Sequence, residues 1–215
     1  MFPGEEHSST AESYYSLGVT QHYQGDLSSA LQSSQRALEI RRKLFGEEHA
    51  STADCYYSLG LTQHAQGDFP SALQSTQRAL DIGLNCLGEE HSSIADCYYS
   101  LGLTQHAQGD FPSALQSTQR ALDIKLKVFG EENSSTADSY HSLGLTHYAQ
   151  GDFSSALHST QRALDIRLKL FGEEHPSTAD SYQSLGDTQH ALGDLSSALQ
   201  SKQHALNIKL KVLGE

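Results

Sequence analysis

The sequence predicts an all-α protein, an α-solenoid built from five copies of one two-helix unit. Six glycines recur at a period of 42 residues and open the phrase GEEH, GEEN or GE: Gly4, Gly46, Gly88, Gly130, Gly172 and Gly214. The second and third copies are identical over 53–82 and 95–124. Such self-similarity is typical of stacked repeats. We expect a single array over 1–215, with repeats at approximately 4–45, 46–87, 88–129, 130–171 and 172–213.

The first helix of a unit is predicted over roughly 51–66. Apolar or small residues recur there at helical spacing, namely Ala53, Tyr56, Leu59, Gly60 and Ala65. Ser51 and Asp54 form the S-x-x-D pattern of a capping box, and the helix is expected to stop at Gly67.

The second helix of the unit is predicted to begin after Asp68, which suits an N-cap. Its apolar stripe consists of Phe69, Ala72, Leu73, Ala79, Leu80 and Ile82. The stripe continues to about Leu87, where Gly88 ends the helix, and no alternating β-type run competes with this interpretation. Because the two helices of a unit carry small residues at Gly60, Ala72 and Ala79, we expect them to approach closely there.

Composition excludes several classes of function. The chain has 215 residues, 37% of them hydrophobic and 19% charged, which is typical of a soluble protein of one or two domains. No apolar run approaches the ~18 residues of a membrane span, and the start MFPGEEHSST lacks a secretory signal, so we expect a cytoplasmic protein. A net charge of -12 argues against nucleic acid or anionic membrane as partner. The cysteines Cys55, Cys86 and Cys97 follow no C-x-x-C spacing and are expected to be reduced thiols.

A 42-residue period alone also allows HEAT or armadillo repeats. The spacing within the unit argues against them: from Tyr56 to Leu80 it reads Y-x-x-L-G-x6-G-D-x3-A-L-x5-A-L. This pattern resembles the longer form of the tetratricopeptide repeat, as in kinesin light chain and nephrocystin-like proteins, and GEEHPSTADSYQSLG at 172–186 resembles its inter-repeat join. The resemblance covers nearly the whole chain. It implies a right-handed superhelix whose first helices line a concave groove that binds partner proteins.

The chain departs from the family pattern at two positions. Gln63 and its equivalents stand where the family usually has an aromatic residue in the first helix. In the middle of the second helix, polar residues also replace an aromatic one; they are Ser34, Thr76, Thr118, Thr160 and Lys202. We expect a looser interior, with these hydroxyls bonded to the carbonyls four residues earlier in the helix.

The resemblance places the partner-binding groove on one face of the first helices. In the first four repeats the groove positions are Glu12, Tyr15, Val19, His22, Asp54, Tyr57, Leu61, His64, Asp96, Tyr99, Leu103, His106, Asp138, His141, Leu145 and Tyr148. All 14 lysines and arginines fall in second helices, so this groove is expected to be acidic. We expect it to bind a protein or peptide segment that is basic or neutral and apolar, whereas the kinesin light chain groove holds acidic peptides.

The repeated histidines raise the alternative of a metal or catalytic site. Zinc needs several ligands at ~2.1 Å, but equivalent helices of adjacent repeats lie about 10 Å apart, so His64 and His106 cannot share one ion. The loop histidines of GEEH include His49, and Asn133 replaces the equivalent residue, which favours a role at the helix start. Nucleophile-elbow, P-loop and dinucleotide-binding motifs are absent from the sequence. We expect no enzyme, no cofactor and no metal.

The sequence supports three further hypotheses. The near-identity of the copies favours, as an alternative, a structural or regulatory array from a larger protein. Because the chain stops at 213–215 after a helix that keeps the apolar residues Leu199, Leu206, Ile208 and Leu210, we also expect weak head-to-tail self-association between terminal repeats. Partner binding should weaken between about pH 7.5 and 5.5, as histidines with an ordinary pKa of ~6.5 gain charge; these are His22, His64, His106, His141 and His190.

Overall fold

The computed structural model describes residues 7–213, and within that range it contains ten α-helices and no strand. The helices are α1 (Ser8–Tyr23), α2 (Leu27–Phe45), α3 (Ala50–Ala65), α4 (Phe69–Leu87), α5 (Ser92–Ala107), α6 (Phe111–Phe129), α7 (Ser134–Gln150), α8 (Phe153–Phe171), α9 (Pro176–Ala191) and α10 (Leu195–Leu213). Odd-numbered helices are the first helices of the repeats and even-numbered helices are the second. The all-α prediction is confirmed. Gly4 and Gly214, which help to define the period, lie outside the described residues.

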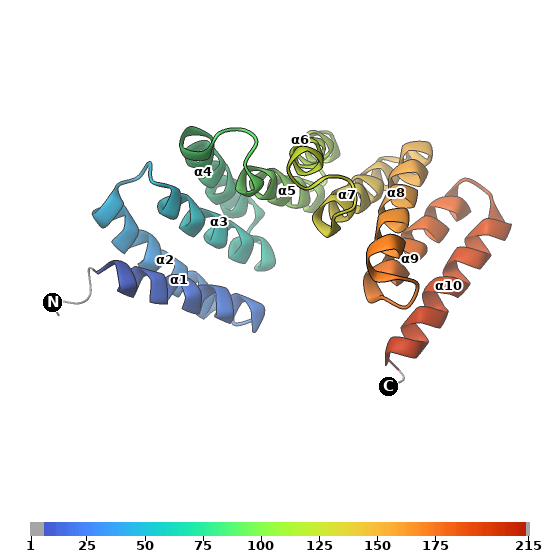
Figure 1. Ribbon diagram of the computed structural model, residues 1–215, viewed down its shortest axis with the longest axis horizontal. Helices are drawn as coiled ribbons and strands as arrows, with labels where there is room; N and C mark the ends of the chain where they lie inside the picture. Colours follow the sequence, from blue (N-terminus) through green and yellow to red (C-terminus); the bar gives the residue numbers. More distant parts are fainter. Residues whose placement is uncertain (1–6, 214–215) are drawn as a thin grey trace. The chain divides into compact units, whose positions relative to one another are not determined.

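The chain divides into two compact units, Met1–Gly109 with α1 to α5 and Asp110–Glu215 with α6 to α10 (Figure 1). Within each unit every helix packs against the next one along the chain. The first helices also contact one another, α1 with α3 and α3 with α5 in the first unit, and α7 with α9 in the second. The first helices of each unit therefore form an inner layer, and the second helices pack on its outside. None of the described helices is long and apolar enough to cross a membrane.

The second helices begin at the predicted aspartates. The Asp68 side chain accepts a hydrogen bond from the backbone N–H of Ser71 at 3.3 Å, and Asp26, Asp110 and Asp152 cap their helices in the same way. Gly67 adopts the left-handed conformation with φ +81°, which glycine reaches without a Cβ penalty. The predicted boundary at Asp68 is therefore confirmed.

The first helices are capped differently from the prediction. The N-cap of α3 is His49, whose Nδ1 accepts a hydrogen bond from the backbone N–H of Ser51 at 3.2 Å. His7, His91, His175 and Asn133 cap the other first helices. The capping box of Ser51 and Asp54 is wrong, because both residues already lie inside the helix, but the predicted role of the GEEH histidine at the helix start is confirmed.

The close approach of α3 and α4 at Gly60 is confirmed. A Cβ atom on Gly60 would lie 2.2 Å from Thr76 Oγ1 and 3.3 Å from the carbonyl oxygen of Ala72. Polar contacts join the same helix pair, since Ser75 Oγ donates to Gln63 Oε1 at 2.7 Å. The glutamine that replaces the family's aromatic residue thus forms a hydrogen bond between the two helices.

The expected hydroxyl bonds within the second helices are found only in part. Thr160 Oγ1 donates to the carbonyl of Ala156 at 2.8 Å, as predicted. The prediction is wrong for Ser34, whose Oγ lies 3.2 Å from Ser58 Oγ, and for Thr76 and Thr118, whose buried hydroxyls have no hydrogen-bond partner among the described residues. The cause is the rotamer: Thr76 turns its hydroxyl toward the glycine of the facing helix, whereas Thr160 turns its methyl group there.

Candidate partner-binding face

The predicted groove residues all lie on α1, α3, α5 and α7, the first helices of the first four repeats. We use the name inner face for these positions within each unit. Among the groove residues that the sequence singled out, the structure brings Tyr15, Asp54, Tyr57 and Asp96 around one cavity of the first unit. The other positions, including Val19, lie along their own helices and do not line that cavity.

Carboxylates of the inner face form ion pairs with second helices of the same repeat. Arg41 Nη2 lies 2.6 Å from Glu12 Oε2, and Arg167 Nη2 lies 2.8 Å from Asp138 Oδ1. The guanidinium groups are buried, whereas the carboxylates remain largely accessible to water. The negative charge that the sequence predicts for the first helices is therefore partly neutralised in the first and fourth repeats.

Arg41 and Arg167 also join their own repeat to the next one. Arg41 Nη1 donates to the carbonyl of Ser51 at 2.7 Å and lies 3.5 Å from Cys55 Sγ. Its guanidinium carbon lies 4.6 Å from the centre of the Tyr15 ring, within range for a cation–π contact. Arg167 Nη1 repeats the pattern, with 2.9 Å to the Ser177 carbonyl and 2.8 Å to Ser181 Oγ. This role was not predicted from the sequence, although the acidic and the basic residue recur 29 positions apart.

The histidines of the repeated phrase TQH connect neighbouring repeats of the first unit. His64 Nδ1 lies 2.9 Å from Thr104 Oγ1, and His22 Nδ1 lies 3.3 Å from Thr62 Oγ1. The His64 ring also packs against Phe69 at the start of α4, with ring centres 5.5 Å apart. Among residues 7–213, no group of three or more His, Cys, Asp or Glu side chains is placed to hold a metal ion.

Burial changes the protonation expected of these histidines. It lowers the pKa of His64 and of His106. It also lowers the pKa of His141 to about 4, with the nearby Arg167 guanidinium as a second cause. The predicted loss of binding between about pH 7.5 and 5.5 assumed an ordinary histidine pKa, and that assumption is wrong for these three residues.

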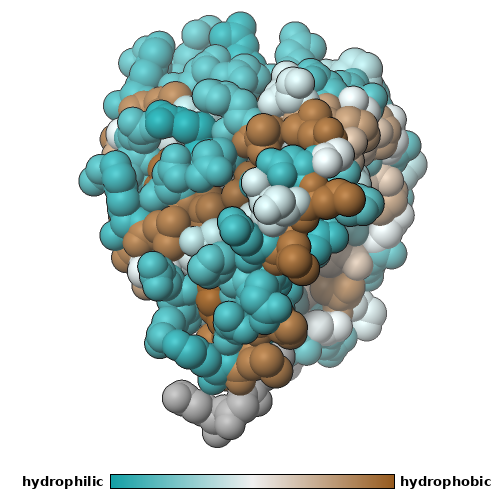
Figure 2. Space-filling view, turned by 90° about the vertical axis from the view of Figure 1, so that its right-hand side faces the viewer, coloured by the Kyte–Doolittle hydropathy of each residue, from teal (hydrophilic) through white to brown (hydrophobic). Residues whose placement is uncertain are grey.

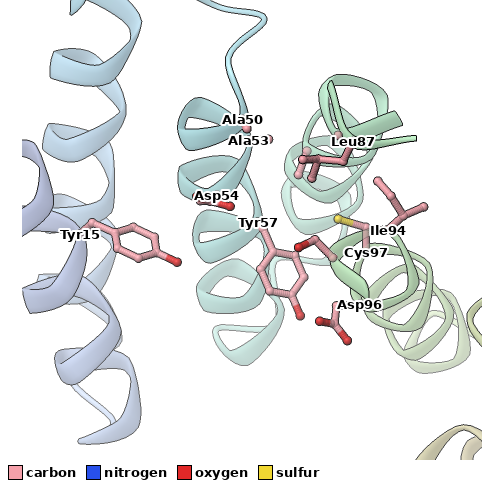
Figure 3. Close-up of a pocket in the computed structure, with 12 residues that line it drawn as sticks. Tyr15, Ala50, Ala53, Asp54, Tyr57, Leu87, Ile94, Asp96 and Cys97 are labelled. Carbon is pink, nitrogen blue, oxygen red and sulfur yellow. The ribbon is translucent and has the colours of Figure 1, made fainter. Parts of the chain in front are cut away.

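The cavity of the first unit lies between α3, α4 and α5, and Tyr15 reaches it from α1 (Figure 3). It has a volume of about 210 Å³ and is lined by both apolar residues and the side chains of Asp54, Asp96 and Cys97. Burial is the main cause that raises the pKa of the Cys97 thiol to about 12, and the negative charge of the Asp96 carboxylate raises it further. Cys97 is therefore protonated at neutral pH and is not an activated nucleophile.

The remaining groove positions differ in exposure. Leu145 and Tyr148 are exposed on α7, and the Tyr148 ring packs in a tilted orientation near Phe153, with ring centres 5.4 Å apart. The half-buried positions are Val19, Leu61, Leu103 and Tyr99. This mixture of aromatic, aliphatic and acidic groups can contact an extended peptide, but the participation of each residue remains a prediction.

Family models of the tetratricopeptide repeat match residues 30–85, 75–127 and 160–211, and related models of the same repeat match 136–177 and 11–44. No curated protein sequence gives a significant match.

Several solved structures share the fold at 23% sequence identity or less. BtubC (BKLC) from P. vanneervenii has a TM-score of 0.86 and 23% identity, covering 97% of this chain and 83% of its own. The nearly identical TPR-like repeats of a candidate kinesin light chain from Podosopora anserina give 0.80 and 23%, covering 96% and 98%. A Rap conjugation gene regulator in complex with a Phr peptide gives 0.70 and 16%, covering 93% and 53%. At these identities the likeness shows the fold alone.

Proposed function

Since this chain belongs to the tetratricopeptide repeat family, we propose that it is a non-catalytic interaction scaffold that binds a peptide or protein segment on its inner face. The fold is that of a scaffold for protein–protein interaction, and a structural neighbour, the Rap regulator, is a complex with a peptide. The segment would lie across first helices of one unit, where Tyr15, Asp54 and Tyr57 are close together.

The chemistry of the inner face supports a basic or a neutral apolar segment. First helices carry no lysine or arginine, and the chain has a net charge of -12. Glu12 and Asp138 are already paired with buried arginines, so they contribute less to the attraction. Asp54 is better placed than Glu12 and Asp138 to pair with a positive charge of the segment. Its side chain is 56% exposed, and the Arg41 guanidinium nitrogen lies 4.0 Å away.

One observation supports this proposal most directly: the cavity of the first unit has an accessible carboxylate, Asp54, beside two tyrosines. Tyrosine presents an apolar ring and a polar tip, and it is favoured at protein interfaces for that reason. A segment that enters the cavity could bury an apolar stem and pair a positive charge at the same time.

A panel of labelled peptides tests the proposal by fluorescence anisotropy. Basic, neutral apolar and acidic peptides of equal length are titrated with the 215-residue chain at two ionic strengths. We expect saturable binding of the first two classes, with the basic class weakened by salt because screening reduces attraction between exposed charges. Tighter binding of acidic peptides, or no saturable binding in any class, would contradict the proposal.

Self-association is a second candidate, favoured by the exposed leucines of α10. Leu206 is 50% exposed, although the equivalent Leu80 is 3% exposed. Leu199 and Leu210 are exposed as well. Figure 2 shows the side of the molecule on which α10 lies in Figure 1, where hydrophobic residues form broken patches among hydrophilic ones. A first helix of another copy could cover this surface, in a head-to-tail contact that need not close.

Sedimentation velocity over a wide concentration range tests this second candidate. We expect weak association of the chain, and we expect the double substitution Leu199→Lys and Leu206→Lys to abolish it. Gln74→Lys with Gln116→Lys adds the same charge outside α10 and should leave association unchanged. A chain that stays monomeric at millimolar concentration would rule this candidate out.

A further inference from the structure

One position of the second helix differs sharply between the repeats. It is basic in four of them, at Arg41, Lys125, Arg167 and Lys209, but the second repeat has Gly83. Where the structure shows Arg41 and Arg167, their guanidinium groups are buried and pair with the first-helix carboxylate 29 residues earlier. Asp54 is the carboxylate 29 residues before Gly83, so its own repeat supplies no cation at this place.

The first repeat shows what surrounds a guanidinium group at this position. Arg41 contacts the Tyr15 ring, the Glu12 carboxylate, the Ser51 carbonyl and the Cys55 sulfur, and the Asp54 carboxylate lies 4.0 Å from its Nη1. In the fourth repeat, Arg167 has the corresponding carboxylate, carbonyl and a serine hydroxyl in place of the sulfur. The same acceptor set therefore binds an arginine in two repeats that lie in different units.

Counterparts of the first four of these groups surround Gly83, two in the second repeat and two at the start of the third, and all four line the cavity. They lie 42 residues after the neighbours of Arg41 and are Tyr57, Asp54, Ser93 and Cys97. Figure 3 shows Tyr57 and Cys97 facing each other between α3 and α5, with Asp54 on α3. The cavity is thus lined by the groups that surround a guanidinium in the first repeat, but residue 83 is a glycine and supplies no guanidinium. Its volume of about 210 Å³ far exceeds the space that one water molecule needs, so it has room for a guanidinium group.

Ile94, at the start of the third repeat, occupies the space beside Gly83. The equivalent residues in adjacent repeats are Thr52 and Thr136, whose hydroxyls donate to the carbonyls of Gly46 and Gly130 at 2.9 and 3.0 Å. Ile94 replaces that threonine and is 1% exposed, and its Cδ1 lies 2.8 Å from the place a Cβ on residue 83 would occupy. Isoleucine thus fills the space beside Gly83, while the polar lining at Asp54, Ser93 and Cys97 is retained.

The cavity is also electrostatically suited to a cation. The Asp54 side chain is 56% exposed at its rim, and its nearest guanidinium nitrogen, on Arg41, lies 4.0 Å away, against 2.6 Å for Glu12. Burial raises the pKa of Tyr57, so the ring stays neutral and offers its face to a cation. Asp96 lies at the other side of the cavity.

We propose that this cavity binds the guanidinium group of an arginine side chain of the partner segment, in the place that Arg41 and Arg167 fill for their own repeats. Arginine suits the cavity better than lysine, because its planar fork can donate to a carboxylate, a carbonyl and a sulfur at once. The proposal rests on the proposed function of the inner face and names the side chain that the first unit recognises.

The test is an NMR titration of the full chain with three small probes of the same length. They are the N-acetyl N-methylamides of arginine, of lysine and of citrulline, the neutral isostere of arginine. We expect saturable amide shifts at Tyr57 and at residues 93–97 with the arginine probe, and binding weaker by about tenfold or more with the other two. Equal binding of arginine and citrulline probes, or shifts elsewhere only, would overturn the proposal.

Two variants locate the binding. Gly83→Arg with Ile94→Thr reproduces the pair formed by Arg41 and Thr52, fills the cavity from within and should abolish binding of the arginine probe. Asp54→Asn leaves the cavity open and should weaken binding by about tenfold or more. Gln74→Arg is the matched control, because it adds the same charge at an exposed site of α4 and should bind as the wild type does. Circular dichroism establishes that each variant is folded, and Asp54→Asn decides the matter if the double variant is not.

Peptide binding separates this proposal from the proposed function. If arginine peptides bind the wild type and the folded variants equally, the inner face remains a scaffold and the arginine cavity is wrong. If the small arginine probe binds in the cavity but no peptide binds, the cavity stands and the scaffold proposal fails. Peptide binding that requires both an arginine and the open cavity supports the two together.

Discussion

His64 Nδ1 lies 2.9 Å from Thr104 Oγ1, and the two residues are 40 positions apart on the adjacent first helices α3 and α5. The Thr104 hydroxyl donates to the carbonyl of Ser100 at 2.8 Å, so the proton of the His64 contact comes from the histidine ring. This fixes the ring as the Nδ1–H tautomer. The histidine of the phrase LTQH is thus a hydrogen-bonded connection between repeats.

We expect His64→Ala to lower the free energy of unfolding by about 1 kcal/mol, because it removes this hydrogen bond and the ring contact with Phe69. His190→Ala is the control, since His190 is exposed at the end of α9. Urea unfolding followed by circular dichroism measures both. Equal effects of the two substitutions would show that the histidine of LTQH does not connect repeats.

Gly60 and Gly83 provide a matched pair within one unit. Both are helical, so alanine gains about 1 kcal/mol of helix propensity at either site. At Gly60 the new Cβ meets Thr76 Oγ1 at 2.2 Å with backbone atoms close behind, whereas at Gly83 it meets only the terminal methyl of Ile94 at 2.8 Å. Gly60→Ala should destabilise by about 1–3 kcal/mol, and Gly83→Ala should be near neutral or stabilising. Thermal unfolding compares them, and a Gly60→Ala protein as stable as Gly83→Ala contradicts the close approach of α3 and α4.

Buried and exposed cations of α8 should differ in their effect on stability. Arg167→Met removes one hydrogen bond to Asp138 in its own repeat and two, to Ser177 and Ser181, that join it to the next repeat, and should cost about 2–4 kcal/mol. Lys169→Met removes an exposed pair with Glu132 at 3.0 Å and should leave stability unchanged. Guanidinium chloride unfolding distinguishes them. Similar losses for both would mean that the buried guanidinium does not hold the repeats together.

His141 predicts a pH dependence of stability. Its pKa in the folded chain is lowered to about 4 by burial and by Arg167, whereas the unfolded value is ~6.5. The unfolded chain therefore binds a proton that the folded chain does not. The stability from neutral His141 is complete above pH ~6.5 and is lost as the pH falls toward 4, by on the order of 2–3 kcal/mol.

The substitution His141→Tyr tests this dependence, because tyrosine occupies the equivalent positions 15, 57 and 99. Between pH 7 and 4.5 the variant should lose less stability than the wild type, while the carboxylates titrate in both proteins. Denaturant unfolding at several pH values gives the two curves. Parallel curves would show that burial of His141 does not lower its pKa.

The repeat architecture was predictable because it depends on local patterns that recur five times. The period gives the repeat length, Asp68 marks the start of the second helix, and Gly60 marks the close approach of the pair. The S-x-x-D pattern wrongly indicates a cap at Ser51, whereas the exchange of His49 for Asn133 correctly indicates a role for these residues at the helix start.

The site could be predicted only in part, because it depends on contacts between repeats. That Arg41 reaches Glu12 and Ser51 does not follow from helical spacing. The cavity arises from the single departure at Gly83, and its signal was available in the sequence: one glycine in a column of arginines and lysines. The candidate site lies at the position where one repeat differs from the other four.

The most direct test of the scaffold proposal is to locate a bound peptide by paramagnetic relaxation. A basic peptide with a nitroxide label is added to the isotopically labelled chain, and loss of amide signal intensity is mapped along the sequence. We predict that the losses fall on first helices, around Tyr15, Asp54, Tyr57 and Tyr99, and spare exposed positions of α4 such as Gln74 and Asp81. Losses confined to second helices, or spread evenly over both layers, would contradict binding on the inner face.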